Sequence, residues 1–221
     1  MEPGITNMTQ PIRAVIADDH PLFRSAMKQA LLNSLGGDIL EADSLDSTLT
    51  LLARYHDVEL VLLDLNMPGN QGLTGLTSLR NGYPGVQVLI VSAEENPDTI
   101  RRALDFGASG YLPKSAPLEC IEQAVASVLD GEQWVPENLK AVLTQNSASA
   151  ERDFADQLSQ LTPHQFKVLK MVADGLLNKQ IAWELQVQET TIKQHVSAIL
   201  RKLNVINRTQ AGVLFKQFMQ Q

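Results

Sequence analysis

Five short apolar runs, each followed by a segment with helical periodicity, restrict the fold of this chain more than any other feature. The runs cover residues 12–17, 38–42, 59–64, 86–92 and 110–112. Apolar runs of this length predict strands buried on both faces of a sheet. Strands that alternate with helices pair in parallel, and right-handed crossovers place the helices on both faces. The sequence therefore predicts a doubly wound α/β domain with a five-stranded parallel sheet.

Charge and composition divide the chain into two parts. Residues 1–131 carry a net charge of −9, whereas residues 151–221 carry +3. Between them the small polar run NSASA is typical of a linker, and the segments after it have helical spacing without strand patterns. A basic helical part suits nucleic acid as a partner. We expect an α/β domain over 11–131, a linker with a possible helix over 132–157, and a small all-α domain over 158–221.

Composition also excludes several protein classes. A single cysteine, Cys120, rules out an internal disulfide framework or a thiolate metal cluster and favours a reducing compartment. No apolar run approaches the roughly 20 residues that cross a bilayer. The first residues lack the basic and apolar regions of a secretory signal. We therefore expect a cytoplasmic protein with no membrane partner.

Polar side chains follow the predicted strands at their carboxyl ends. Asp18 and Asp19 end the first run, Asp64 the third and Ser92 the fourth, and Lys114 follows the fifth. The carboxyl ends of parallel strands meet at one edge of the sheet, where ligands bind. A helix-capping role could explain one of the aspartates, but it does not explain the whole set. We expect these five side chains to lie close together.

Three carboxylates at one edge of a sheet require a cation. At an effective dielectric of about 20, two carboxylates about 4 Å apart repel by roughly 4 kcal/mol, and one lysine offsets only part of this. All-oxygen ligation with room for water favours Mg²⁺. A metal beside a carboxylate suits phosphoryl transfer, and Asp64 is then a candidate nucleophile that forms an aspartyl phosphate.

The motifs VIADDHP, LLDLNMP, LIVSA and GYLPKS together resemble the receiver domain of two-component response regulators. The resemblance covers about residues 11–131 and implies a flavodoxin-like fold with Mg²⁺ as the cofactor. It implies that Asp64 is the phosphoacceptor. It also implies that Asp19, Asp64 and the main-chain carbonyl of Asn66 bind the metal, and that Asp18 acts largely through water.

The same resemblance implies roles for three further residues. Ser92 and Lys114 would contact the phosphoryl oxygens, and Tyr111 would be the aromatic residue whose orientation reports the active state. Movement of Ser92 towards a phosphoryl group would vacate space for that ring, which makes a two-state packing element. Tyr111 could equally be a half-buried core aromatic. We expect His20 to open the first helix rather than to bind metal.

Residues 161–215 resemble the LuxR-type helix-turn-helix domain. Thr162, Pro163 and Gln165 predict a capping box with proline in the first turn. In the third helix of this domain, apolar residues at 3–4 spacing should face the core, and they are Ile192, Val196, Ile199, Leu200 and Leu203. Trp183 on the second helix is expected to pack.

The opposite face of that third helix is polar and net basic, which suits the major groove of DNA. Thr190 lies on this face with the base-reading candidates Lys193, Gln194 and Ser197. The residues expected to position the phosphate backbone are Lys179, Thr191, Arg201 and Arg208. Solvation of a surface side chain would explain any one of them alone, but explains the set less well.

The two resemblances together imply a response regulator of the NarL/FixJ type. Such a protein is a DNA-binding transcription regulator rather than an enzyme, and a sensor histidine kinase controls it by phosphorylating Asp64. Double-stranded DNA and the kinase are the expected partners. The apolar residues Leu214, Phe215 and Phe218 suggest a homodimer contact.

Two other functions are compatible with parts of the pattern. The receiver could serve only as a dimerisation module that does not depend on phosphorylation, although the intact Asp, Ser and Lys set argues against this. A phosphatase similar to haloacid dehalogenases would also use Asp64 as the nucleophile. That class needs a second aspartate two positions further on, where this chain has Asn66.

Overall fold

Five parallel strands form the centre of the N-terminal domain in the computed structural model, which describes residues 12–35, 38–143 and 149–219. The strands are β1 (Ile12–Ala17), β2 (Asp38–Ala42), β3 (Leu60–Leu63), β4 (Gln87–Ser92) and β5 (Gly110–Pro113). Their order is β2-β1-β3-β4-β5, and every pairing is parallel. The doubly wound sheet predicted from the apolar runs is confirmed.

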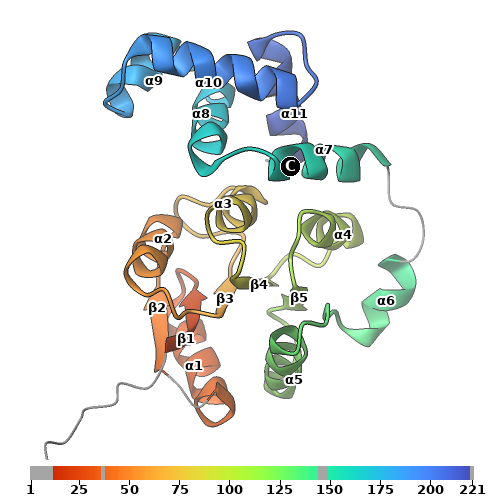
Figure 1. Cartoon of the computed structure of the whole chain (residues 1–221). Helices are drawn as coiled ribbons and strands as arrows, with labels where there is room; N and C mark the ends of the chain where they lie inside the picture. The colour runs from red at the N-terminus through yellow and green to blue at the C-terminus, as the bar shows by residue number, and fades with distance from the viewer. Residues whose placement is uncertain (1–11, 36–37, 144–148, 220–221) are drawn as a thin grey trace, which may run out of the picture.

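Five helices cover the two faces of this sheet (Figure 1). They are α1 (Pro21–Leu35), α2 (Leu45–Arg54), α3 (Thr74–Gly82), α4 (Pro97–Asp105) and α5 (Leu118–Leu129). Alternate strand residues point to opposite faces. Ile16 of β1 packs with Met27 of α1 and Ile121 of α5, whereas Val15 belongs to the cluster under α2, α3 and α4. All four residues of β3 are buried, which accounts for its unbroken apolar sequence.

The elements described after α5 are all helices, apart from an isolated bridge between Trp134 and Gly110. The helices are α6 (Glu137–Leu143), α7 (Ser149–Ser159), α8 (Pro163–Ala173), α9 (Asn178–Glu184), α10 (Glu189–Lys202) and α11 (Arg208–Met219). The capping box at the start of α8 is present, with the Thr162 side chain accepting from the main chain of Gln165 at 3.2 Å. Ile192 and Ile199 of α10 are buried, as the 3–4 spacing predicts. None of the described helices is long and apolar enough to cross a membrane.

The helical domain packs on the side of the sheet that carries α3 and α4 (Figure 1). The Phe154 ring of α7 contacts Phe106 after α4 and Phe218 of α11, with ring centroids 6.5 and 4.9 Å apart respectively. Arg152 of α7 donates to the Asp105 carboxylate at 2.9 Å. The main-chain nitrogen of Leu73 donates to the carbonyl of Met219 at 3.2 Å.

These contacts cover most of the apolar surface of α11. Phe215 is fully buried, and Leu214 and Phe218 pack against the same apolar cluster. The apolar surface that suggested a homodimer contact is therefore largely covered within the chain. Val213 of α11 stays 59% exposed. The segment expected to be a linker contains α6 and α7, and α7 contributes the buried residues Phe154 and Leu158 to the domain contact.

Candidate functional site

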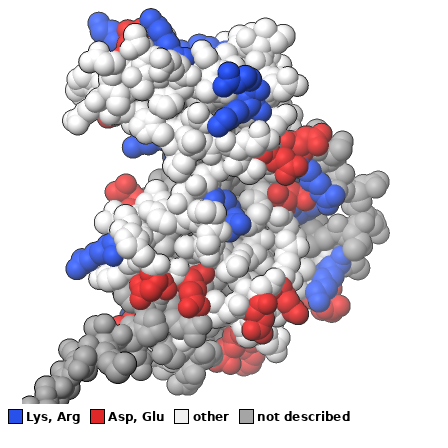
Figure 2. All heavy atoms as spheres, in the orientation of Figure 1, with Lys and Arg blue, Asp and Glu red and all other residues white. Residues whose placement is uncertain are grey.

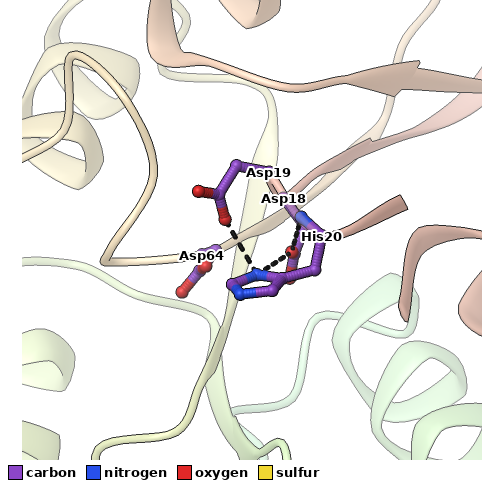
Figure 3. Close-up of side chains that lie close together, drawn as sticks. All are labelled: Asp18, Asp19, His20 and Asp64. Atoms are coloured by element: carbon purple, nitrogen blue, oxygen red, sulfur yellow. Dashed lines mark hydrogen bonds and ion pairs between the residues drawn. The ribbon is translucent and has the colours of Figure 1, made fainter. Parts of the chain in front are cut away.

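The predicted carboxylate cluster forms where β1 and β3 end. Asp18 and Asp64 directly follow these strands and are 0% and 1% exposed, whereas the Asp19 side chain is 34% exposed. Figure 3 shows these side chains and His20 converging on one point. Oxygen or nitrogen atoms of the four residues lie within 4.8 Å of one another. This concentration of oxygen donors at the sheet edge fits a hard divalent cation.

Lys114, which follows β5, joins the two buried carboxylates. Its ammonium group lies 2.7 Å from Asp18 Oδ2 and 2.9 Å from Asp64 Oδ2. Burial by itself would lower the pKa of Lys114, but the hydrogen bonds and charges of Asp18 and Asp64 outweigh it and raise that pKa above its usual value. Lys114 therefore stays charged at neutral pH and offsets part of the carboxylate repulsion.

His20 belongs to the cluster more closely than the sequence suggests. Its ring Nδ1 lies 2.8 Å from Asp19 Oδ1 and 3.1 Å from Asp18 Oδ1 (Figure 3). Its main-chain carbonyl accepts from Arg24 at 3.0 Å, so His20 also opens α1 as predicted. Sequence spacing places His20 after the strand but does not determine the direction of its ring. One ring nitrogen of His20 thus lies close to both carboxylates.

Ser92 and Tyr111 lie in the core beside the cluster. Ser92 at the end of β4 is fully buried, and its hydroxyl accepts from the main-chain nitrogen of Glu94 at 3.2 Å. Tyr111 of β5 is also fully buried, and its hydroxyl donates to the carbonyl of Glu94 at 2.6 Å. Burial raises the pKa of Tyr111 to about 12. Both side chains thus fasten the loop between β4 and α4.

The loop after β3 orients the carboxylate of Asp64. The main-chain nitrogen of Asn66 donates to Asp64 Oδ1 at 3.2 Å, and the Asn66 side chain is exposed. No pattern in the sequence points to Asn70, whose buried side-chain amide donates to the main-chain carbonyl of Asp64 at 2.8 Å. A lone asparagine in a predicted loop gives little sign of a buried contact six residues back along the chain.

The predicted DNA-reading face of α10 is open to solvent. Its exposed side chains are Thr190, Lys193, Gln194, Ser197 and Arg201, and Thr191 is partly exposed. Figure 1 shows α10 on the side of the helical domain away from the sheet. Lys193 forms a surface ion pair with Glu189 at 3.0 Å, which is too weak and exposed to hold it away from another partner.

Three further residues singled out in the sequence lie on α9 and α11 near this face, and they are Lys179, Trp183 and Arg208. Arg208 donates to Asn178 Oδ1 at 3.0 Å and to the Leu176 carbonyl at 2.6 Å, so it fastens α11 to the start of α9. Lys179 is exposed on α9. The expectation that Trp183 packs is wrong, because its side chain is 78% exposed. Among the described residues of the short helix α9, only Ile181 and Ala182, which precede Trp183, are buried.

Charge follows the same division into domains. Figure 2 shows acidic side chains over the lower part of the molecule, which holds the sheet, and over α7, whereas Lys and Arg side chains lie at the top over the rest of the helical domain. The α10 face contributes Lys193 and Arg201 to the basic part. A basic surface around an exposed helix is the electrostatic pattern of a nucleic-acid reader.

Comparison with known proteins identifies both domains. The chain matches the response regulator receiver domain over residues 14–126 and the luxR family of bacterial regulatory proteins over residues 159–215. It is 44% identical to the glycerol metabolism activator of Pseudomonas putida, covering 90% of this chain and 92% of that protein. It is 36% identical to the nitrate/nitrite response regulator NarL of Escherichia coli K12, covering 94% and 96%.

Solved structures share the fold. The RcsB response regulator of Salmonella typhimurium superimposes with a TM-score of 0.57 at 22% identity, covering 94% of this chain and 99% of that one. An RcsB–DNA complex gives a TM-score of 0.55 at 23% identity, covering 94% of this chain and 98% of that one. The architecture is that of a transcription regulator and not of an enzyme. The chain belongs to the NarL/FixJ-type response regulators, with a receiver domain followed by a LuxR-type DNA-binding domain.

Proposed function

We propose that a partner sensor histidine kinase phosphorylates Asp64, and that this phosphorylation controls the binding of double-stranded DNA by the C-terminal domain. The observation that supports this most strongly is the position of Lys114 between Asp18 and Asp64, with Ser92 buried at the adjacent strand end. A buried carboxylate, a fixed ammonium group and a hydroxyl at one sheet edge provide a nucleophile and two donors for phosphoryl oxygens.

The same edge has the donor set that Mg²⁺ requires. Asp19, Asp64 and the main-chain carbonyl of Asn66 would hold the ion, and Asp18 would act through water. When bound, the ion neutralises phosphoryl oxygens. The Asp64 carboxylate would attack the phosphorus as the bond between phosphorus and the histidine nitrogen of the kinase breaks, which leaves that histidine neutral on the kinase. Asp64 Oδ1 accepts from the Asn66 main chain and Oδ2 from Lys114, so both oxygens are held in place before the attack. Lys114 would then exchange its contact with Oδ2 for a phosphoryl oxygen.

A route from Asp64 to the helical domain is available through α4. A phosphoryl group that draws the Ser92 hydroxyl towards itself would disturb the bond from the Glu94 main chain and therefore the loop that precedes α4. α4 carries Asp105, which binds Arg152, and leads into Phe106, which contacts Phe154. Moving a population from 1:99 to 99:1 takes about 5.5 kcal/mol of differential stabilisation. The attraction of the doubly charged phosphoryl group to Lys114 and Mg²⁺ would supply much of this free energy.

The output would be base reading by α10. Lys193, Gln194 and Ser197 would contact base edges, with Thr190 beside them on the same face. The residues proposed to contact the backbone are Lys179, Thr191, Arg201 and Arg208. The contacts of Arg208 within the chain support a role in fixing α9 for that purpose. A homodimer would read two half-sites about one helical turn apart. We place this DNA binding in the cytoplasm, because the bacterial chromosome lies there.

The experiment that tests this function asks whether Asp64 accepts a phosphoryl group. The full-length protein is incubated with acetyl phosphate and Mg²⁺, and the modified residue is located by mass spectrometry after borohydride trapping. We expect modification at Asp64, dependent on Mg²⁺ and absent from Asp64→Asn. A wild-type protein that stays unmodified while retaining dimerisation and DNA binding would instead support a phosphorylation-independent dimerisation module. Repeated turnover of an aryl phosphate would support a phosphatase.

A further inference from the structure

The side-chain amide of Asn70 is buried, and both its nitrogen and its oxygen form hydrogen bonds to the main chain. Asn70 lies in the loop between β3 and α3 and is 6% exposed. Its Nδ2 donates to the main-chain carbonyl of Asp64 at 2.8 Å, and its Oδ1 accepts from the main-chain nitrogen of Gly75 at 2.8 Å. One side chain therefore connects the phosphoacceptor to the first turn of α3.

The bond to Gly75 replaces a missing helix cap. The N-cap position of α3 is Leu73, whose apolar side chain has no atom that can accept a hydrogen bond from the first turn. The free main-chain N–H groups at a helix start need such an acceptor. Asn70, three residues before the N-cap, supplies it at Gly75. The start of α3 is thereby fixed relative to Asp64 rather than capped by itself.

Gly75 provides the space for this amide. A Cβ atom at position 75 would lie 2.6 Å from Oδ1, 2.7 Å from Cγ and 2.9 Å from Nδ2 of Asn70, all closer than real Cβ contacts. The backbone there is helical and does not require glycine, and glycine weakens a helix compared with alanine. The lack of a side chain at Gly75 is therefore explained by the amide of Asn70.

We propose that Asn70 is a positioning residue for the phosphoacceptor, that it fixes the main chain of Asp64 so that its carboxylate points at the phosphodonor, and that Gly75 is its matching space. This inference rests on the proposed phosphorylation of Asp64. The amide restrains the residue whose carboxylate must attack in line, and a misplaced reacting group reacts much more slowly.

The same bonds continue into the helical domain. Leu73, between Asn70 and Gly75, donates from its main chain to the carbonyl of Met219 at 3.2 Å. Its own carbonyl accepts from the Thr77 hydroxyl at 3.1 Å. The loop that Asn70 ties to Asp64 therefore also contacts the end of α11, separately from the contacts that α4 makes.

The kinetic test compares variants of the full-length protein with acetyl phosphate and Mg²⁺. We expect Asn70→Ala to lower the initial rate of Asp64 phosphorylation about tenfold or more. Asn81→Ala is the matched control and should react at the wild-type rate. Asn81 also lies on α3, but its Nδ2 has no hydrogen-bond partner among the described residues.

Asn70→Asp separates positioning from simple support of the fold. The carboxylate that this variant introduces can still accept from the Gly75 main chain but cannot donate to the Asp64 carbonyl. The cap of α3 is therefore kept while the restraint on Asp64 is lost, so the Tm should fall less than in Asn70→Ala while the phosphorylation rate falls as far. A wild-type phosphorylation rate in Asn70→Asp would overturn the positioning role.

A double-mutant cycle tests the pairing with Gly75 independently of phosphorylation. Gly75→Ala should lower the Tm of the wild-type protein because the new Cβ displaces the amide. In the Asn70→Ala background the space is free, so Gly75→Ala should raise the Tm as alanine does in a helix. An equal effect in both backgrounds would overturn the proposed pairing.

Failure of the positioning role of Asn70 can be distinguished from failure of Asp64 phosphorylation. If wild type and Asn70→Ala are phosphorylated at Asp64 at the same rate, the inference is wrong and the proposed function stands. If wild type accepts no phosphoryl group, both are wrong.

Discussion

The hydroxyl of Tyr111 donates a hydrogen bond to the main-chain carbonyl of Glu94, with 2.6 Å between the two oxygens. This bond joins the buried centre of β5 to the loop that starts α4. The side chain of Asn96 caps α4, and Asp105 in the last turn binds Arg152 of the helical domain. The loop beside the phosphoacceptor therefore precedes α4, and the last turn of the same helix makes the contact with the helical domain.

Removing the hydroxyl of Tyr111 should change the alkaline stability of the protein. Burial raises the pKa of Tyr111 from the unfolded value of 10.0 to about 12, which corresponds to roughly 2–3 kcal/mol favouring the protonated form. That stability is fully present below pH 10 and is lost as the pH rises towards 12. We expect the free energy of unfolding of wild type, measured with urea, to fall steeply in this pH window. The free energy of unfolding of Tyr111→Phe should fall less steeply.

At neutral pH the same variant leaves the Glu94 carbonyl without this donor. The free energy of unfolding should fall by about 1–3 kcal/mol, the cost of an unpaired buried group. The phosphorylation rate of Asp64 should stay at the wild-type value while the gain in DNA affinity on phosphorylation shrinks. An unchanged gain would show that the Tyr111–Glu94 bond has no part in transmission.

Loss of Lys114 should make the stability of the receiver depend on Mg²⁺. Lys114→Ala leaves Asp18 and Asp64 buried without their cation, and breaking such a pair costs about 3–5 kcal/mol. Added Mg²⁺ should restore much of this, because an ion that binds only the folded state stabilises it by mass action. Thermal unfolding in EDTA and in Mg²⁺ measures both effects.

Asp19→Asn is the control for the metal. It removes a proposed ligand but keeps the size of the side chain and leaves Lys114 in place. Its Tm should respond less to Mg²⁺ than that of wild type. If Lys114→Ala is no less stable than wild type in EDTA, the ion pairs do not hold the site together.

Truncating Phe106 should loosen the contact between the domains. Its ring packs on Phe154 of α7 at 6.5 Å, and Phe154 packs on Phe218 at the end of α11. Phe106→Ala should therefore increase the radius of gyration measured by small-angle X-ray scattering and split the unfolding transition in two. Leu31→Ala, in the cluster on the opposite face of the sheet, should destabilise the receiver by about 2–5 kcal/mol without expanding the protein. Equal expansion by both variants would argue against a specific contact at Phe106.

Two exposed residues of α10 should affect DNA binding differently. Lys193→Ala should cost about 1–3 kcal/mol on the specific site and weaken discrimination between sequences, as expected for a base contact. Arg201→Ala should weaken binding to all sequences and reduce the slope of log affinity against log salt by about 1. Fluorescence anisotropy at several salt concentrations separates these effects. Matching salt slopes and matching losses on every sequence would contradict the assignment of Lys193 to bases.

The sequence predicts the sheet and the carboxylate cluster because both depend on local patterns. Strand ends in a parallel sheet lie at one edge, so Asp18, Asp64 and Lys114 meet whatever the details of packing. The contact of His20 depends on the direction of a side chain, which spacing does not determine. Asn70 is similar, because its role depends on the space beside Gly75 that its amide fills. Such contacts are visible only once the loops are placed.

The helical domain shows the same limit. The 3–4 spacing of α10 predicts its buried face because a helix has a fixed period. The exposure of Trp183 and the burial of Phe215 depend instead on which neighbours cover each helix. The end of α11 contacts Leu73 and Thr77 at the start of α3, and the Phe218 carbonyl accepts from Arg102 of α4. These contacts have no sequence pattern of their own, because apolar residues facing a second domain have the same spacing as residues facing a core.

The affinity for DNA with and without a phosphoryl mimic tests the central claim most directly. Full-length wild type and Asp64→Asn are titrated against labelled promoter DNA in Mg²⁺, with and without beryllium fluoride, at one fixed salt concentration. We expect the mimic to tighten wild-type binding at least tenfold and to leave Asp64→Asn unchanged. Equal wild-type affinity in both conditions, with the mimic shown to be bound at Asp64, would contradict control of α10 by Asp64.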